Sequence, residues 1–255
     1  SSNLVIENNR IADLAVGENF YAKYGYQTDG INIGFQTSHF TLQDNDISDV
    51  GEGLDMFGTD GLVVNNSVEG ARHYGLKFVH GASHIVAESN TLVSTGIAAI
   101  ILAGSTVRDR DTANNIIINN TIEGMHQYDP DLPGSYGIAI RANGGTSFLP
   151  RNNLIAGNIL HLNGEGQYGL LADSSGNFDN DFIHNFLEGY TIAATRISDG
   201  TATVISFPET SPQKYDWVVG TPGDDALQGD ASANAIYGGA GEDTLFGSDG
   251  DDIFI

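Results

Sequence analysis

Residues 40–56 read FTLQDNDISDVGEGLDM, and both halves of this stretch recur along most of the chain. The first half places an Asn between apolar residues, LQDNDI in this copy, and the second is a short apolar segment opened by Gly, here GLDM. The recurrent Asn falls at Asn9, Asn45, Asn66, Asn90, Asn120, Asn158 and Asn185. Short apolar strands repeated at a coil-sized period predict a solenoid in which equivalent Asn side chains stack into a ladder.

The fold class expected from this period is all-β: a right-handed parallel β-helix over residues 1–218, with two short strands in each coil. The Gly and β-branched content excludes a helical solenoid. The shortest spacing, from Asn45 to Asn66, approximates one bare coil. Because no capping segment precedes the first coil, we expect the β-helix to be truncated at its N-terminal end.

Longer spacings imply loops inserted into the coils, which solenoids place on one flank. We expect such loops at residues 17–29, 105–113 and 126–136. The first contains GENFYAKYGYQTDG, whose aromatic rings, Tyr24 among them, could line a sugar. A polar stretch at 198–219, with TATVISF as a last strand, is expected to join the β-helix to the C-terminal segment.

The C-terminal segment, residues 219–255, contains four tandem nonapeptides from Gly220: GTPGDDALQ, GDASANAIY, GGAGEDTLF and GSDGDDIFI. The third matches G-G-x-G-x-D-x-U-x at every specified position. Gly permits tight turns, and backbone carbonyls with the acid at position six suit a hard cation. Turns two units apart would share calcium, which pairs Asp225 with Asp243 and Asn234 with Asp252. The segment resembles the RTX (hemolysin-type) repeats of bacterial type I secreted proteins, which implies an extracellular protein that folds in calcium.

Composition narrows the classes of partner. The chain has 33 acidic residues against 10 Lys and Arg, a formal net charge of -23, which argues against nucleic acid and anionic membranes. It has no Cys, which excludes disulfides and thiolate metal sites and fits a secreted bacterial protein without disulfides. Residues 1–20 lack the features of a signal peptide, so any export signal is expected outside this chain.

Side chains of the Gly-opened strands alternate between two faces. Two residues after each Gly the side chain faces outward, so Asn32, Asp55 and Lys77 form one outward column on adjacent coils. The same count continues the column with Ala98, Ala139 and Leu171. Polar and charged residues flank the column: Asp29, Glu52, Arg72, His73, His80 and Arg141. Basic groups gathered in so acidic a chain suit an anionic sugar.

The combination of β-helix and RTX repeats resembles the bacterial mannuronan C-5 epimerases. Where that family carries a GYGFDPHE-like segment, this chain has GEGLDMFG at 51–58, and RHYGLKFVHGASH at 72–84 is similar to its RHGF segment. The resemblance implies that Asp55 keeps the acidic position and that Arg72 and His73 carry over with a one-residue shift before the Gly. Glu52 stands where the catalytic Tyr is expected, and Phe57 where the His is expected.

Epimerases and polysaccharide lyases both remove the C-5 proton of a uronate and must neutralise its carboxylate. We therefore expect Lys77 or His73 to be the base and Arg72 or Arg141 the carboxylate clamp. Asp55, the fourth expected catalytic residue, would with Asn32 either bind calcium or orient the base. The expected substrate-binding residues are Tyr24, Asp29, Asn32, Glu52, His80 and Arg141.

Two other classes stay open at this point. A β-helix glycoside hydrolase would use a pair of acids drawn from Asp29, Glu52 and Asp55. A non-catalytic adhesin would bind glycans on the same face without changing them. In every case the expected partner is an anionic polysaccharide and the expected cofactor calcium, while the sugar and the oligomeric state are left open.

Overall fold

The computed structural model describes residues 3–14, 28–104, 109–126, 135–142, 148–163, 168–173, 180–190, 192–195, 215–221, 223–239 and 241–255. Contacts divide the chain into two units, Ser1–Ser211 and Pro212–Ile255. Every regular element in the described ranges is a β-strand, and no helix there is long and apolar enough to cross a membrane. Most of the predicted loop at 17–29, which contains Tyr24, and the predicted strand TATVISF lie outside the described residues.

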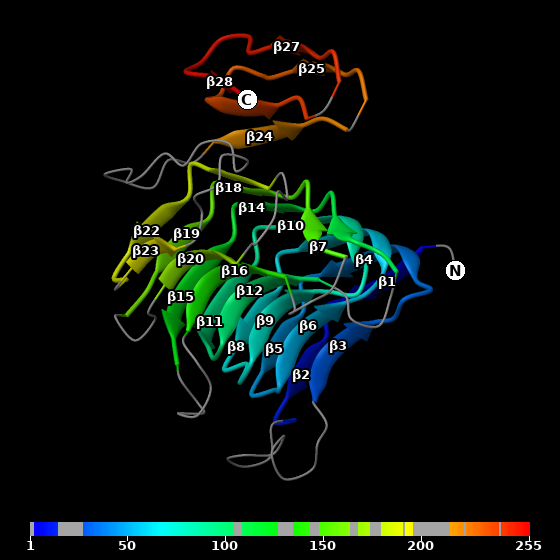
Figure 1. Ribbon diagram of the computed structural model, residues 1–255, viewed down its shortest axis with the longest axis vertical. Coiled ribbons are helices and arrows are strands. Elements are labelled where there is room, and N and C mark those ends of the chain that lie inside the picture. The colour runs from blue at the N-terminus through cyan, green and yellow to red at the C-terminus, as the bar shows by residue number, and fades with distance from the viewer. Residues whose placement is uncertain are drawn as a thin grey trace. The chain divides into compact units, whose positions relative to one another are not determined.

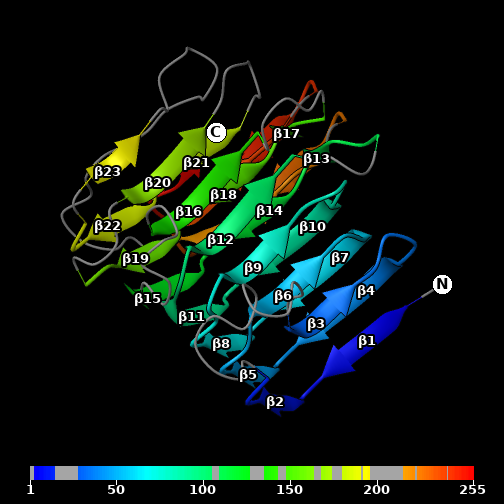
Figure 2. The same cartoon turned by 60° about the horizontal axis from the view of Figure 1, so that its bottom comes forward.

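The first unit is the predicted parallel β-helix, with strands of successive coils paired in parallel along three sheets (Figures 1 and 2). Sheet 1 contains β1 (Leu4–Glu7), β4 (Ser38–Gln43), β7 (Thr59–Val64), β10 (Ser83–Glu88), β13 (Thr112–Ala113), β14 (Ile116–Ile118), β17 (Pro150–Arg151), β18 (Leu154–Ala156) and β21 (Asp181–Ile183). Sheet 2 contains β2 (Arg10–Ala12), β5 (Asp46–Ser48), β8 (Ser67–Glu69), β11 (Thr91–Thr95), β15 (Thr121–Met125), β19 (Ile159–His161) and β22 (Phe186–Glu188). Sheet 3 contains β3 (Asp29–Ile33), β6 (Glu52–Met56), β9 (Tyr74–Phe78), β12 (Ala98–Ala103), β16 (Tyr136–Arg141), β20 (Tyr168–Asp173) and β23 (Ile192–Thr195).

Each full coil therefore has three main strands, where the sequence pattern predicted two. The segment around the recurrent Asn is two strands, one in sheet 1 and one in sheet 2, separated by a turn. Asp44, just before Asn45, has φ 53°, and Asn65 has φ 54° in the next coil. Asp and Asn tolerate this left-handed conformation better than most residues, so the chain can turn there without Gly.

The predicted Asn ladder forms at this turn, and all of its members except the exposed Asn9 are buried. The side-chain amide of Asn45 donates to Oδ1 of Asn66 at 2.9 Å, and the same oxygen accepts the Asn45 backbone N–H at 3.1 Å. Asn66 repeats both bonds to Asn90 and also donates to the Leu42 carbonyl at 2.9 Å. The ladder thus satisfies backbone groups that the turn leaves without a strand partner.

A second ladder was not predicted. Asn115 donates to Asn153 at 2.9 Å, and Asn153 donates to Asn180 at 2.8 Å. Each member precedes a member of the first ladder by five residues, for example Asn115 before Asn120. That constant offset is a sequence signal that could have revealed it.

The core lies between the three sheets, and sheet 3 contributes inward side chains such as Leu54, Leu76 and Ile100, all fully buried. The register Asn32–Asp55–Lys77 confirms the predicted start of the outward column. The next member is Ile101, whereas counting from Gly96 had predicted Ala98. The count failed because β12 begins two residues after Gly96.

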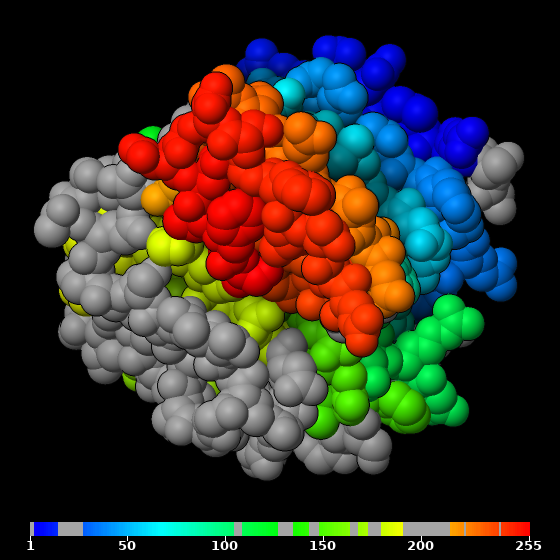
Figure 3. All heavy atoms as spheres, turned by 90° about the horizontal axis from the view of Figure 1, so that it is seen from above, coloured from blue at the N-terminus to red at the C-terminus, as the bar shows by residue number. Residues whose placement is uncertain are grey.

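The second unit is a small β-roll (Figure 3, orange to red). One sheet holds β24 (Asp216–Val219), β26 (Asn234–Tyr237) and β28 (Ile253–Phe254), and the other β25 (Ala226–Gln228) and β27 (Thr244–Phe246). Successive nonapeptides alternate between the sheets, so residues 18 apart stack on each other. β24 pairs with β26, which extends the roll a few residues before the expected start at 219.

Candidate functional site

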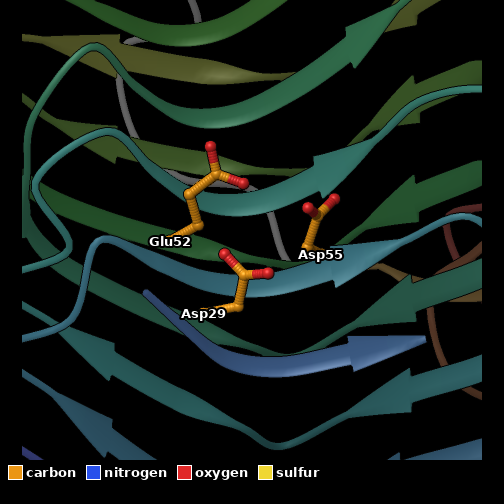
Figure 4. Close-up of side chains that lie close together, drawn as sticks. All are labelled: Asp29, Glu52 and Asp55. Atoms are coloured by element: carbon orange, nitrogen blue, oxygen red, sulfur yellow. The ribbon is translucent and has the colours of Figure 1, made fainter. Parts of the chain in front are cut away.

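An acid cluster, Asp29, Glu52 and Asp55, lies on the outer side of sheet 3 at its first two described strands (Figure 4). Asp29 on β3 is in register with Glu52 on β6. One oxygen from each carboxylate lies within 4.8 Å of the others. Strand alternation turns Asp55 away from the apolar core. It would place Asp29 and Glu52 on the inner face with Ile31 and Leu54, so their position beside Asp55 means that the alternation is broken between Glu52 and Leu54 and between Asp29 and Ile31. Glu52 is nevertheless fully buried, and Asp55 is 2% exposed.

Lys77 on β9 is the cation of this cluster. Its Nζ donates to Oε2 of Glu52 at 2.7 Å and to Oδ2 of Asp55 at 3.1 Å, and its side chain is 15% exposed. The Nζ also lies 5.8 Å from the ring centre of Phe57 and 5.9 Å from that of Tyr74. Lys77 is therefore held by two carboxylates and flanked by two aromatic rings.

Each acid of the cluster has one oxygen bound and one buried oxygen without a hydrogen bond. Besides the bonds from Lys77, the amide of Asn32 donates to Oδ2 of Asp29 at 3.1 Å and to Oδ2 of Asp55 at 3.5 Å. The oxygens left without a hydrogen-bond partner are Oδ1 of Asp29, Oε1 of Glu52 and Oδ1 of Asp55.

Burial controls the protonation of these groups. It raises the pKa of Glu52 to about 8 and that of Asp55 to about 6, although Lys77 opposes both shifts. Burial alone would lower the pKa of Lys77, but Glu52 and Asp55 together hold that pKa above its ordinary value. Lys77 consequently stays protonated at neutral pH, which fits a cationic clamp better than a general base.

His73 and Tyr74 lie beside Glu52, where the next coil enters sheet 3. Nδ1 of His73 is 4.0 Å from Oε1 of Glu52, and the His73 side chain is 17% exposed. Tyr74 is in register with Glu52, and its ring centre is 6.2 Å from that of His73. Burial and the Glu52 carboxylate raise the pKa of Tyr74, so its hydroxyl keeps its proton. Arg72 precedes them and is half-buried, and its backbone N–H donates to the Val50 carbonyl.

The other predicted residues lie further along the same face. His80 follows the end of β9, and its ring centre is 5.3 Å from that of Phe57. Arg141 ends β16, two coils beyond Lys77, with its Cζ 5.9 Å from the ring centre of Tyr136. Among the described residues, Arg141 forms no ion pair with the acid cluster, whereas Asn32 donates hydrogen bonds to it. Tyr24 lies outside the described residues.

A row of tyrosines on this face was missed. Ala98 on β12 is in register with Tyr74 on β9 and with Tyr136 on β16, and Tyr136 is in register with Tyr168 on β20. The rings of Tyr136 and Tyr168 stack with centres 5.0 Å apart. Each of the three directly precedes the Gly of its strand, so the recurring Tyr-Gly dipeptide was the available signal. Tyr136 is buried, whereas Tyr74 and Tyr168 are half-buried, so the exposed parts of these two rings offer flat apolar surfaces of the kind that sugar rings stack on.

In the β-roll, the residues predicted as calcium ligands stack in the expected pairs. Oδ1 of Asp243 accepts the Asp225 N–H, and Oδ1 of Asp252 accepts the Asn234 N–H, both at 2.9 Å. A Cβ on Gly238 would lie only 2.5 Å from Oδ2 of Asp243, so Gly keeps the space beside this oxygen open. Half-buried carboxylates beside Gly-rich turns fit calcium, which prefers several oxygen ligands.

Comparison with known families supports both halves of the fold. Residues 1–108 match the family described as a right-handed β-helix region, and residues 219–254 match four copies of the RTX calcium-binding nonapeptide repeat. RTX repeats bind calcium, which confirms the expected cofactor, and they are typical of type I secreted extracellular proteins. Searches of curated proteins and of solved structures produced no match. The two matches fit a secreted carbohydrate-acting or adhesin-like protein.

Proposed function

We propose that this protein is a secreted enzyme that acts on a uronic-acid polysaccharide by removing the C-5 proton, as a C-5 epimerase or a lyase. The observation that carries the proposal is the grouping of His73, Tyr74 and Lys77 around the buried Glu52 on the outer face of sheet 3. The three side chains differ in the chemistry that they offer, and all three stand beside one point of that face.

Lys77 supplies the positive charge. Two of its three N–H groups are bound to Glu52 and Asp55, and the third has no hydrogen-bond partner among the described residues. A uronate carboxylate bound there is neutralised by an ammonium that stays charged. This makes the C-5 proton more acidic, because the carbanion spreads its charge into that carboxylate. Arg72 is the second candidate for this contact.

His73 is the proposed base and Tyr74 the proposed acid. The C-5 proton passes to His73, whose cationic form the nearby Glu52 carboxylate stabilises when that acid is ionised. Tyr74 then gives its proton either to C-5 from the opposite face, which inverts the sugar, or to the O-4 leaving group. In the second case the C-4–O-4 bond breaks and a C-4–C-5 double bond forms.

A glycoside hydrolase is the second candidate, because the pKa values of Glu52 and Asp55 are pushed apart to about 8 and about 6. Such a pair resembles a general acid beside an ionised partner. It ranks second because both carboxylates are buried beneath Lys77, whereas a hydrolase must place them against the glycosidic oxygen.

Incubation with alginate and pectate separates these reactions. New ultraviolet absorbance from an unsaturated uronate indicates a lyase, and altered proton NMR without chain cleavage indicates an epimerase. New reducing ends without unsaturation indicate a hydrolase, and binding without change indicates an adhesin. The last two outcomes would refute the proposal.

A pair of histidine variants tests the assignment of the base. His73→Gln should lower turnover at least about 100-fold, the usual contribution of a positioned base. His84→Gln is the matched control, because His84 is an exposed residue of β10 in sheet 1. Equal activity of the two variants would show that His73 is not the base.

A further inference from the structure

We propose that Asp29, Glu52 and Asp55 form a divalent-cation site on the β-helix, separate from the RTX repeats, and that calcium is the ion it binds. The starting observation is that the three acids bring their carboxylates together on the outer side of sheet 3 (Figure 4). Acids alone gather on many protein surfaces. A metal site differs from such a surface in the hydrogen bonding of the individual carboxylate oxygens.

Each of the three carboxylates has a buried oxygen with no hydrogen bond: Oδ1 of Asp29, Oε1 of Glu52 and Oδ1 of Asp55. Glu52 is fully buried and Asp55 is 2% exposed, so bulk water does not satisfy them. Nδ1 of His73 lies 4.0 Å from Oε1 of Glu52, which is too long for a hydrogen bond. Buried unpaired carboxylate oxygens are costly, and a bound ion is one of the few groups that satisfies several at once.

The opposite oxygens are all occupied by donors. Lys77 holds Oε2 of Glu52 and Oδ2 of Asp55, while Asn32 holds Oδ2 of Asp29 and also reaches Asp55. A metal site needs this kind of outer shell, because donors on the far oxygens fix the direction in which the near oxygens point. Lys77 and Asn32 therefore orient the carboxylates without occupying the three remaining oxygens.

Charge leads to the same conclusion. Carboxylates that bind a metal ion are deprotonated, and three of them with one ammonium then sum to a charge of −2 in a largely buried cluster. A divalent cation at the three unpaired oxygens brings this sum to zero, whereas a monovalent ion leaves half of the excess.

The coordination of the cluster favours calcium over magnesium. One oxygen from each acid lies within 4.8 Å of the others, and calcium, which binds at about 2.3–2.6 Å, can touch oxygens at that separation. Magnesium loses its water molecules reluctantly and usually keeps several of them, so it suits a largely buried set of carboxylates less well. All three ligands are carboxylates, which suits a hard cation and does not favour zinc or copper.

A cation here would also remove the negative charge that repels a sugar carboxylate. That consequence rests on the proposed function, whereas the site itself does not. Metal binding and turnover are measured separately, so an active enzyme without the ion, or a binding protein without activity, distinguishes the two proposals.

The test counts bound calcium by isothermal titration of the full chain after removal of calcium with a chelator. Asp55→Asn should bind one calcium fewer per chain than the wild type. Asp60→Asn is the control, because Asp60 is exposed on β7 and the change has the same charge and size. It should leave the count unchanged, and magnesium should not titrate the site that Asp55→Asn removes.

Equal calcium counts for Asp55→Asn and the wild type would overturn the proposal. If Asp55→Asn does not fold, wild-type crystals soaked in Tb³⁺, which replaces calcium, decide the question. An anomalous peak between the three carboxylates supports the site, and peaks confined to the RTX repeats refute it.

Discussion

Replacement of Lys77 by Met should destabilise the β-helix strongly, by an amount that depends on pH. Lys77 is 15% exposed and holds two carboxylates that are almost fully buried, at 2.7 and 3.1 Å. Met keeps most of the apolar side chain but leaves both acids without their cation. Loss of one partner from a buried pair costs about 3–5 kcal/mol. We expect this loss in the free energy of unfolding near pH 9, where Glu52 and Asp55, with pKa values of about 8 and about 6, are ionised.

The assay is urea unfolding in calcium-free buffer, followed by circular dichroism at pH 5 and pH 9. The cost should shrink at pH 5, because protonated Glu52 and Asp55 no longer need a cation. Arg10→Met is the control: its pair with Asp46 spans 3.9 Å between exposed side chains and is worth less than about 1 kcal/mol. The reasoning is refuted if Lys77→Met costs no more than Arg10→Met, or if its cost is the same at both pH values.

Three further predictions concern the pKa of Glu52, the Asn ladder and the RTX repeats. In calcium-free buffer, the free energy of unfolding of the wild type should fall as pH rises from about 5 to about 8. The pKa of Glu52 is about 8 in the folded protein and 4.5 in the unfolded chain. Between these two values the folded state holds one more proton than the unfolded state, so a rise in pH destabilises it. Glu52→Gln should flatten this slope in urea titrations, and an unchanged slope would contradict the assignment. Asn66→Asp should lower the free energy of unfolding in urea by roughly 3 kcal/mol. The side chain loses two donated hydrogen bonds, to Asn90 and to the Leu42 carbonyl, worth about 1 kcal/mol each, and a carboxylate becomes buried. Asn65→Asp is the control and should cost little, because Asn65 is exposed. Removal of calcium should expose residues 220–255 to limited proteolysis, because the clustered acids repel one another without a cation, and equal cleavage with and without calcium would count against this.

The repeat architecture could be predicted from local patterns. An Asn at a regular spacing, a Gly-opened apolar segment and a nonapeptide register are properties of short stretches, and parallel stacking multiplies each of them into a ladder or a sheet. The same locality explains two errors. The turn at Asp44 depends on a backbone conformation that Asp adopts without any change in the apolar pattern, so two strands were counted as one. β12 starts after Gly96 without using it as the opening residue, so Ala98 was predicted in the place of Ile101.

The sequence by itself determined that Asn32, Asp55 and Lys77 share the outer face of sheet 3, because period-two alternation and coil register place them in one column. It could not decide their chemistry. The pKa of Glu52 depends on how completely neighbouring coils bury it, and that of Lys77 on two carboxylates from another coil. Which carboxylate oxygens are bound and which remain unpaired depends on side-chain geometry between coils. Electrostatic energy varies steeply with distance and burial, so only the tertiary structure could show that Lys77 stays charged and that the acid cluster has buried oxygens without hydrogen bonds.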